Sequence, residues 1–187
     1  MARYNTTKIA DVLYSWFVKK KFHGCGRSFR IGYPSIIESG HRIEVGNDVR
    51  IGCHSWLNCI ESGGNRVSLR LGNGCRIGRF GHVNAYRDVV LEDYVLIADR
   101  VHISDVSHGY YNSKIPIILQ PVDRCEPVRI ETGAWIGTGA VILPGVTVGK
   151  NAVVGANAVV SKDVPNNSVA RGNPAKTFEK KSASEKG

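Results

Sequence analysis

The sequence predicts an all-β fold, a parallel β-helix built from hexapeptide repeats. Branched aliphatic residues return every six positions through the second half of the chain, and a small or β-branched residue follows each of them by four. An α-helix would repeat its apolar face about every 3.6 residues and a simple strand about every two, so neither explains this spacing. Each hexad therefore supplies one short strand and one turn. The residues concerned are Ile130, Ile136, Ile142, Val148, Val154 and Val160, followed by Ala134, Ala140, Val146, Ala152, Ala158 and Val164.

Three hexads close one triangular coil, so residues eighteen positions apart should lie on one another along a prism. This predicts that Ile130 contacts Val148 and that Ile142 contacts Val160, at the ordinary strand separation of about 4.8 Å. The repeat continues upstream with less regular spacing, from Val45 to Ile103. The 21 glycines suit tight corners, where other residues resist the backbone angles that are needed.

The N-terminal third should hold two regions, a helical cap over residues 1–30 and irregular first coils over residues 31–66. An amphipathic helix is predicted from about Thr6 to Phe22, because apolar residues recur there at helical spacing. We interpret this helix as a cap on the open end of the prism, with membrane anchoring as the alternative. The apolar residues are Ile9, Val12, Leu13, Trp16 and Phe17.

The β-helix proper is expected over residues 67–165, with one protruding loop at residues 105–127. The interval between Ile103 and Ile130 is twenty-seven residues, which is not a multiple of six, and it contains Pro116, Pro121 and Pro127. Loops that leave a rigid scaffold commonly carry function. After Pro165 the repeat stops, and residues 166–187 are expected to form a polar tail.

Length and composition indicate a single domain of 187 residues. The net charge of +9 suits an anionic cofactor or an anionic membrane surface. Nucleic-acid binding is disfavoured, because the basic residues are not interleaved with aromatic residues and no recognition helix is evident. No apolar run is long enough to span a bilayer and no signal peptide is expected. The five cysteines form no CxxC pair and are interpreted as reduced thiols.

Four local motifs extend the pattern beyond the fold. They are Ile103-Ser-Asp-Val-Ser-His-Gly109, Val128-Arg-Ile-Glu-Thr-Gly-Ala-Trp-Ile-Gly137, Ser161-Lys-Asp-Val-Pro165 and Gly172-Asn-Pro-Ala-Lys176. With the hexads, they make residues 67–178 resemble the hexapeptide-repeat acyltransferases, which fold as left-handed β-helices. The resemblance is strongest to the sugar O-acetyltransferases, including those acting on maltose, galactosides, colanic acid and O-antigen.

The resemblance implies an acetyl-CoA-dependent transferase that acetylates a sugar hydroxyl in cell-surface polysaccharide biosynthesis, with a nucleotide-linked or a lipid-linked sugar as the alternative acceptors. It implies a homotrimer in the cytoplasm, with the inner face of the membrane as the alternative location. Neither a metal ion nor a nucleic acid is expected to bind. His108 stands where the family carries its general base, and a neutral imidazole suits that role near pH 7. Asp105 is expected to orient this imidazole or to cap a turn. No serine or cysteine nucleophile with an attached base is evident, which favours direct transfer.

Substrate contacts also follow from the resemblance. Asn84 matches a residue near the acceptor, where an amide suits a hydroxyl, although asparagine also serves at corners of such helices. Asp88 is the closest match to the family's acidic acceptor contact. The donor is expected along the outside of the prism and in the C-terminal tail. The matching positions are Trp135, Thr138, Ala156, Ser161, Lys162 and Lys176.

Three alternatives stay open. An aminosugar N-acetyltransferase could use the same base and donor groove. The γ-class carbonic anhydrases share the prism and place three histidines on a metal, for which His82, His102 and His108 are the candidates. A prism without catalytic activity could serve as a scaffold, and it would have no affinity for coenzyme A.

Overall fold

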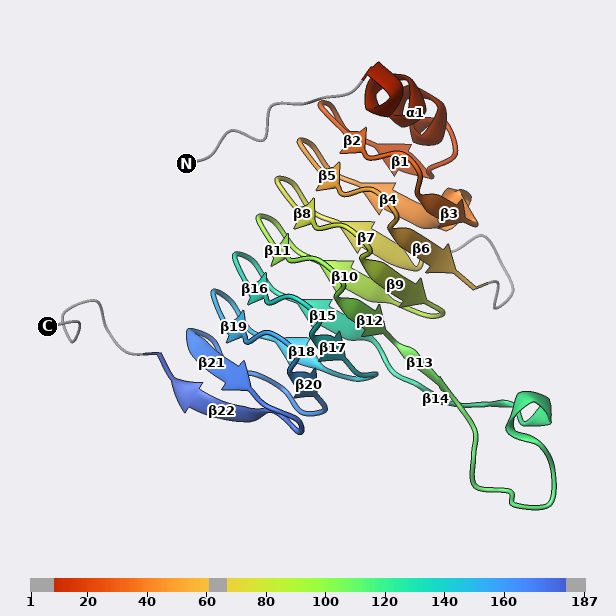
Figure 1. Cartoon of the computed structure of the whole chain (residues 1–187), viewed down its shortest axis with the longest axis vertical. Helices are drawn as coiled ribbons and strands as arrows, with labels where there is room; N and C mark the ends of the chain where they lie inside the picture. The colour runs from red at the N-terminus through yellow and green to blue at the C-terminus, as the bar shows by residue number, and fades with distance from the viewer. Residues whose placement is uncertain (1–8, 61–66, 181–187) are drawn as a thin grey trace, which may run out of the picture.

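The computed structural model describes residues 9–60 and 67–180. The chain winds as a parallel β-helix whose coils stack along the long axis of the molecule (Figure 1). Residues 6–8 of the predicted helix and the end of the tail lie outside the described residues.

Three parallel sheets form the sides of the prism, and each coil contributes one strand to each of them. Sheet A comprises β1 (Gly24–Cys25), β4 (Ile43–Val45), β7 (Leu69–Leu71), β10 (Val89–Leu91), β15 (Val128–Ile130) and β18 (Thr147–Val148). Sheet B comprises β2 (Arg30–Ile31), β5 (Arg50–Ile51), β8 (Arg76–Ile77), β11 (Leu96–Ile97), β16 (Trp135–Ile136), β19 (Val153–Val154), β21 (Ser168–Arg171) and β22 (Lys176–Glu179). Sheet C comprises β3 (Ile36–Glu38), β6 (Trp56–Cys59), β9 (His82–Ala85), β12 (His102–Ser104), β17 (Val141–Ile142) and β20 (Val159–Val160).

The register of the last coils confirms the predicted stacking. Ile130 pairs with Val148, Ile136 with Val154 and Ile142 with Val160, each across eighteen residues. All these side chains are buried, as are the small residues four positions after each of them. Burying one valine or isoleucine side chain stabilises the fold by roughly 1.5–3 kcal/mol, so the column of inward residues holds the prism together.

The earlier coils use the same sheets but are longer. Ile31 pairs with Ile51, and Ile77 with Ile97, across twenty residues rather than eighteen. In these coils, steps from sheet A to B and from B to C remain six residues. Every additional residue lies at the edge between sheets C and A, including the short 3-10 helix η1 (Gly40–Arg42). The coils therefore begin at β1, and the early ones differ from the last ones in length at this one corner.

Helix α1 (Ile9–Lys19) lies at the N-terminal end of the prism beside β2 (Figure 1). Its packed side buries Ser15 and Val18, and the Ser15 Oγ accepts a hydrogen bond from the Ile31 N–H at 2.9 Å. Phe22 and Phe29 close the end of the core, with ring centroids 5.3 Å apart. The apolar side chains expected to cap the prism point into solvent instead, since these two phenylalanines already occupy the end of the core.

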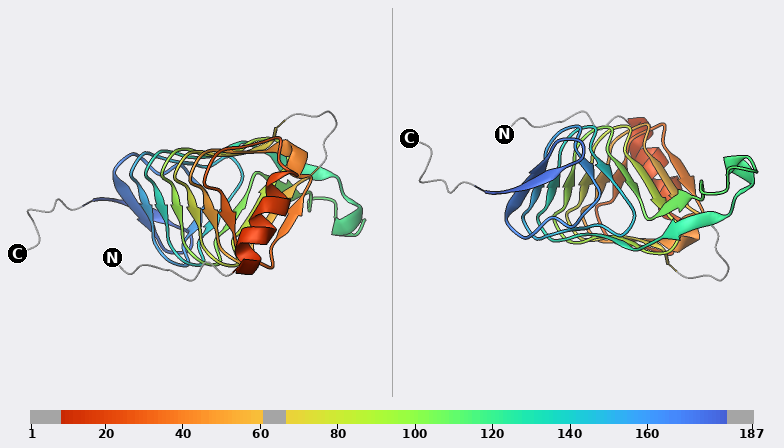
Figure 2. Two further views of the ribbon diagram at one scale, coloured as in Figure 1. Left: turned by 90° about the horizontal axis from the view of Figure 1, so that it is seen from above. Right: turned by 90° about the horizontal axis from the view of Figure 1, so that it is seen from below.

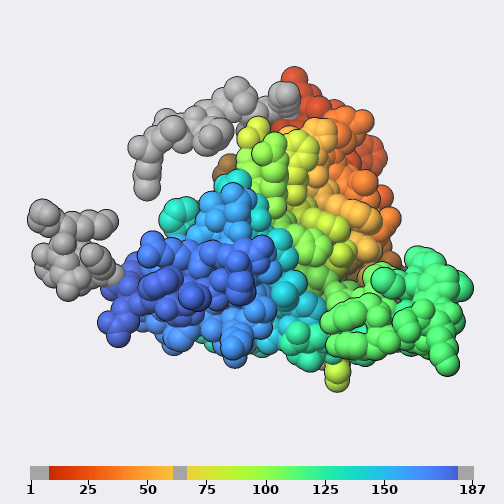
Figure 3. Space-filling model, turned by 60° about the horizontal axis from the view of Figure 1, so that its bottom comes forward, coloured from red at the N-terminus to blue at the C-terminus, as the bar shows by residue number. Residues whose placement is uncertain are grey.

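The interval between Ile103 and Ile130 forms the predicted protrusion. Strands β13 (Val106–His108) and β14 (Val122–Cys125) make an antiparallel hairpin, with the 3-10 helix η2 (Ile117–Leu119) near its tip. The hairpin leaves the prism sideways at the edge between sheets C and A (Figures 1 and 2). In the space-filling view it is a separate lobe beside the C-terminal coils (Figure 3).

At the C-terminal end, the predicted tail begins as a hairpin. Strand β21 continues sheet B and β22 returns antiparallel beside it. The five cysteines carry free thiols. Burial raises the pKa of the Cys75 thiol to about 11, so this side chain behaves as a small apolar residue. Within residues 9–60 and 67–180, none of the helices has the length and apolar character needed to cross a membrane.

Candidate functional site

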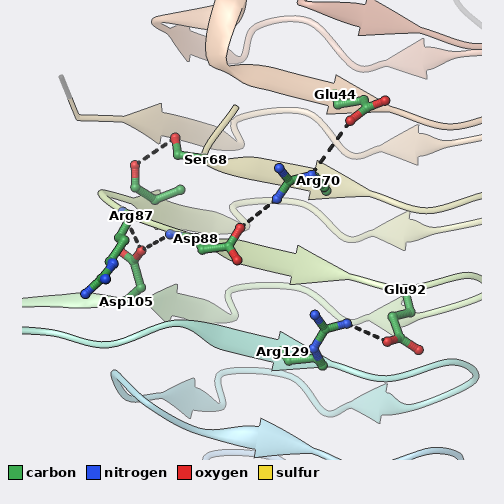
Figure 4. A network of polar contacts seen from close by, with 9 residues as sticks. Glu44, Ser68, Arg70, Arg87, Asp88, Glu92, Asp105 and Arg129 are labelled. Atoms are coloured by element: carbon green, nitrogen blue, oxygen red, sulfur yellow. Dashed lines mark hydrogen bonds and ion pairs between the residues drawn. The ribbon is translucent and has the colours of Figure 1, made fainter. Parts of the chain in front are cut away.

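The edge between sheets C and A is organised around one buried carboxylate. Asp105 has no exposed surface, and its oxygens accept hydrogen bonds from the backbone N–H groups of Tyr86, Arg87 and Asp88, each at 2.7 Å (Figure 4). Of the two roles expected for it, the structure places Asp105 as the cap of the turn in the preceding coil. Both carboxylate oxygens are engaged there, so Asp105 fixes the root of the hairpin to the prism.

His108 ends the first strand of this hairpin, just after an irregularity in the register between Ser107 and His108. Its side chain is exposed, and in the part of the chain described here its ring makes no hydrogen bond or ion pair. The next residue, Gly109, is buried and donates its N–H to the Pro121 carbonyl at 3.0 Å. A β-carbon at Gly109 would lie 2.8 Å from that same oxygen, so the two strands approach closely beside the imidazole.

A chain of hydrogen bonds crosses the outer face of sheet C. Asn84 Oδ1 lies 3.3 Å from Asn58 Nδ2 and 3.0 Å from His82 Nε2. His82 Nδ1 lies 3.2 Å from His102 Nδ1. The Trp56 indole stacks on the His82 ring, with centroids 4.6 Å apart and planes 4° from parallel. These side chains therefore form one ladder across neighbouring coils.

The direction of these hydrogen bonds follows from what each atom can donate. Asn84 Oδ1 can only accept, so His82 Nε2 carries a proton and donates it. In a neutral His82, Nδ1 then carries no proton and accepts a hydrogen bond from His102 Nδ1–H. In a neutral His102, Nε2 is therefore the nitrogen that carries no proton. Burial, and then the neighbouring His82, lower the pKa of His102, which favours this neutral state. The Asn84 amide nitrogen remains available to donate.

Asp88 lies near Asp105 but points elsewhere. Its carboxylate forms an ion pair with Arg70 at 2.7 Å, and Arg70 in turn lies 3.8 Å from Glu44 on the outer face of sheet A (Figure 4). The structure therefore places Asp88 and Asn84 on different faces of the prism. Arg70 and Glu44 also line an open groove of about 500 Å³, which is formed by residues of sheet A and of its border with sheet B.

The predicted donor positions fall on four parts of the molecule. Trp135 is 48 % exposed on the outer face of sheet B. Thr138 and Ala156 are exposed and stack at the edge between sheets B and C, where Asn157 N–H donates to the Thr138 carbonyl at 2.8 Å. Ser161 and Lys162 are exposed at the edge between sheets C and A, below the root of the hairpin. Lys176 is exposed at the start of β22. One chain brings Thr138 and Ala156 together but leaves Lys162 on the far side of sheet C.

Among residues 9–60 and 67–180, no three histidine, cysteine or acidic side chains gather as a metal site would require. His82 and His102 do lie side by side, as their spacing suggested, but His108 does not join them in one cluster. From the sequence, these two histidines were candidates only for binding a metal, and Asn58 and Trp56 had no expected role. The strand register shows why all four side chains meet: Trp56 pairs with His82, and Asn58 pairs with Asn84.

Comparison with known proteins adds to this geometry. The family described as "Bacterial transferase hexapeptide (six repeats)" matches residues 127–162. A Mycobacterium tuberculosis protein named "Probable acetyltransferase" is 35 % identical over 143 residues, which cover 76 % of this chain and 46 % of the relative. The chain carries the repeats of the hexapeptide transferases. It spans about half the length of that curated relative.

Two solved acyltransferase structures agree with the fold. AntD, an N-acyltransferase from Bacillus cereus crystallised with dTDP and coenzyme A, superposes with a TM-score of 0.77 at 19 % identity, over 89 % of each chain. A galactoside acetyltransferase in complex with coenzyme A gives a TM-score of 0.67 at 24 % identity, over 97 % of this chain and 77 % of that one. The predicted left-handed β-helix is thereby confirmed.

Proposed function

We propose that this protein transfers an acetyl group from acetyl-CoA to a hydroxyl of a sugar, in the biosynthesis of a cell-surface polysaccharide. The support from sequence is the relative named as a probable acetyltransferase, together with the hexapeptide transferase family itself. The observation that carries the proposal is the exposed His108, which has no partner within the described residues and stands at the root of a hairpin anchored by Asp105.

His108 acts as the general base in this proposal. The neutral imidazole takes the proton from the sugar hydroxyl as the hydroxyl oxygen attacks the thioester carbon. The carbon–sulfur bond then breaks, and the imidazolium returns its proton to the leaving thiolate. Such a base typically contributes about 10²–10⁴-fold to the rate. The acetyl group passes directly between the two substrates, because an acetyl thioester is already activated.

Asn84 is the acceptor contact that the geometry favours. Its oxygen is held by Asn58 and His82, so the amide nitrogen is oriented to donate a hydrogen bond to a sugar oxygen. Asp88 is held by Arg70 on another face. Asp88 therefore supports the site through its backbone, which belongs to the turn that Asp105 caps. Its carboxylate can contact the acceptor only if acceptor binding breaks the ion pair with Arg70.

The donor residues favour a site shared between subunits. Ala156 lies at the edge between sheets B and C, whereas His108 leaves the prism at the edge between sheets C and A. A single chain keeps these two edges apart by the width of a sheet. A site that contains both His108 and the donor groove therefore forms where two copies meet, and we propose a homotrimer with one site at each contact.

An aminosugar N-acyltransferase is the second candidate. AntD, whose fold matches over most of this chain, was crystallised with dTDP-4-amino-4,6-dideoxyglucose and coenzyme A. An amine needs the same base and the same donor groove as a hydroxyl does. The acceptor contacts of Asn84 serve either group, because its amide nitrogen can donate to any sugar oxygen near the reacting atom.

The test is thiol release from acetyl-CoA with a panel of nucleotide-linked and lipid-linked sugars and aminosugars, comparing the natural protein with His108→Ala. We expect acceptor-dependent release that falls by about 10²-fold or more in the variant. His41→Ala, which removes another exposed imidazole at the far end of the prism, should retain the activity.

Hydroxylamine treatment of the product separates the two candidates, since it cleaves an ester and spares an amide. Equal release by the natural protein and His108→Ala would assign the base to another residue, and His102 would be tested next. No release with any acceptor, together with no binding of coenzyme A, would refute the transferase and favour the scaffold.

A further inference from the structure

The outward face of helix α1 is lined by exposed, large apolar side chains. Trp16 is 56 % exposed and Phe17 is 61 % exposed, and the other large apolar residues on this face are also exposed. The packed face instead uses Ser15 and Val18, which are buried. The exposed residues follow helical spacing along one side and are Ile9, Val12, Leu13, Trp16 and Phe17.

Basic residues border this apolar face. Lys20 Nζ lies 3.6 Å from the centre of the Trp16 ring, and Lys21 and Arg27 are exposed nearby in the sequence. Lys19 is held by the prism, since its Nζ donates to the Gly26 carbonyl at 3.0 Å. The only acidic residue of α1, Asp11, accepts a hydrogen bond from the Tyr33 N–H on the packed side. The outward side of the helix is therefore apolar along its length and cationic at its C-terminal end.

The position of α1 leaves this face accessible to a flat surface. The helix lies across one end of the long axis, and the hairpin of β13 and β14 protrudes near the other end (Figures 1 and 2). An apolar helical face bordered by lysines, lying in the plane of an interface, is how peripheral helices bind anionic lipid. A second copy of α1 is a poorer partner for this face, because it would bring Lys20 and Lys21 of the two copies close to each other.

We propose that α1 docks the protein on an anionic lipid surface, with Trp16 and Phe17 inserted at the headgroup level and Lys20 and Lys21 against the phosphates. The prism axis then stands away from the membrane. This inference does not depend on the proposed acetyl transfer, and it concerns a surface far along the axis from His108.

Flotation of the full-length protein with vesicles tests the proposal. The vesicles are phosphatidylglycerol mixed with phosphatidylcholine, and phosphatidylcholine alone. We expect binding to the anionic vesicles that weakens at high salt. The double variant Trp16→Ser, Phe17→Ser should lose about tenfold or more in partitioning, and each of Lys20→Glu and Lys21→Glu about fivefold.

A matched control substitutes a more exposed apolar pair elsewhere in the chain. Ile118 and Leu119, at the tip of the hairpin, are 79 % and 70 % exposed. Ile118→Ser, Leu119→Ser should bind vesicles as the natural protein does. Because the side chains changed in α1 are exposed, thermal unfolding should be nearly unaltered in both double variants, which separates lost binding from lost folding.

Fluorescence gives an independent reading. In the background Trp56→Phe, Trp135→Phe, Trp16 is the only tryptophan left, and its emission should shift to the blue when anionic vesicles are added. The proposal is overturned if the natural protein does not float with anionic vesicles, or if the α1 double variant floats equally well. A third result also overturns it: the natural protein does not bind vesicles, and the α1 double variant sediments with a smaller mass. A second copy of the chain would then be what covers this face.

Discussion

At the scale of single residues, Asp105 decides how the candidate site is held. One carboxylate with no exposed surface meets three backbone donors of the preceding coil. Hydrogen bonds that involve a charged acceptor are stronger than neutral ones, and the donors would be left without partners in its absence. Asp105 thus holds the start of the hairpin against the preceding coil. His108 follows three residues later and is positioned by this attachment.

We expect Asp105→Ala to lower the free energy of unfolding by about 2–4 kcal/mol, because three backbone N–H groups lose the buried carboxylate that accepts from them. Asp123→Ala removes an exposed carboxylate from the same hairpin, and surface substitutions of that kind usually change stability by about 0.5 kcal/mol or less. Urea unfolding of the two variants measures the difference. Equal stabilities would show that the cap is not needed to hold the hairpin root.

The histidine pair of sheet C predicts a pH dependence. Burial, followed by the nearby His82, lowers the pKa of His102 from its ordinary value of 6.5. As the pH falls below that value, the unfolded chain binds a proton that the folded chain resists, so stability is lost as the pH falls through the folded pKa. Above pH 6.5 both states are neutral at this residue and the penalty vanishes.

His102→Gln should therefore lose less stability than the natural protein between about pH 7 and pH 5. Urea midpoints at a series of pH values measure this, with the exposed His54→Gln as the control that should keep the natural slope. If the slope is unchanged in His102→Gln, the pair does not couple to folding, and the proton arrangement assigned to Asn84, His82 and His102 loses its support.

At the scale of elements, the corners limit the sequence more tightly than the strands do. A β-carbon added at Gly137 would lie 2.7 Å from the Ala156 nitrogen and from the Val154 oxygen, both backbone atoms of the next coil. Neither atom can move away without disturbing the ladder between β16 and β19. At Gly24 the nearest atom to such a β-carbon is a flexible side-chain carbon at 3.9 Å.

The two glycines make a matched pair for a stability test. Gly137→Ala should cost about 2 kcal/mol or more through displaced backbone. Gly24→Ala should be neutral or stabilising by about 0.4–1 kcal/mol, because the unfolded chain loses freedom. Thermal unfolding of both variants gives the comparison. Similar melting temperatures of the two variants would mean that the coils can move apart at Gly137 with little loss of stability.

At the scale of the whole molecule, the distribution of the candidate residues predicts complementation between inactive variants. His108→Ala removes the base, and Ala156→Trp fills the donor groove at another edge of the prism. If each site takes His108 from one subunit and Ala156 from its neighbour, then about a quarter of the sites in randomly mixed trimers keep both natural residues. Co-refolded equal mixtures should recover about that fraction of the natural activity.

Each variant refolded alone is the control and should stay inactive. No recovery in the mixture would place both residues of a site in one chain and would contradict the shared site. Sedimentation of the natural protein provides the mass of the assembly independently of its activity.

The sequence by itself determined the repeat, and with it most of the fold. A period of six fixes which side chains point inward, so the pairing of Ile130 with Val148 and the protrusion after Ile103 could both be predicted. Only the tertiary structure shows how long each corner is and which residues of successive coils pair. Corner lengths vary from coil to coil at one edge only, and register across twenty or thirty-nine residues cannot be read from a hexad.

The candidate site divides in the same way. Motifs pointed to His108, Asp105 and Asn84, because their local sequences resemble those of known enzymes. The hydrogen-bond partners of Asp105 and Asn84, the ion pair of Asp88 and the outward apolar face of α1 depended on packing. Local sequence fixes which side a residue faces, whereas its neighbours there come from other coils, and only the folded prism brings those coils together.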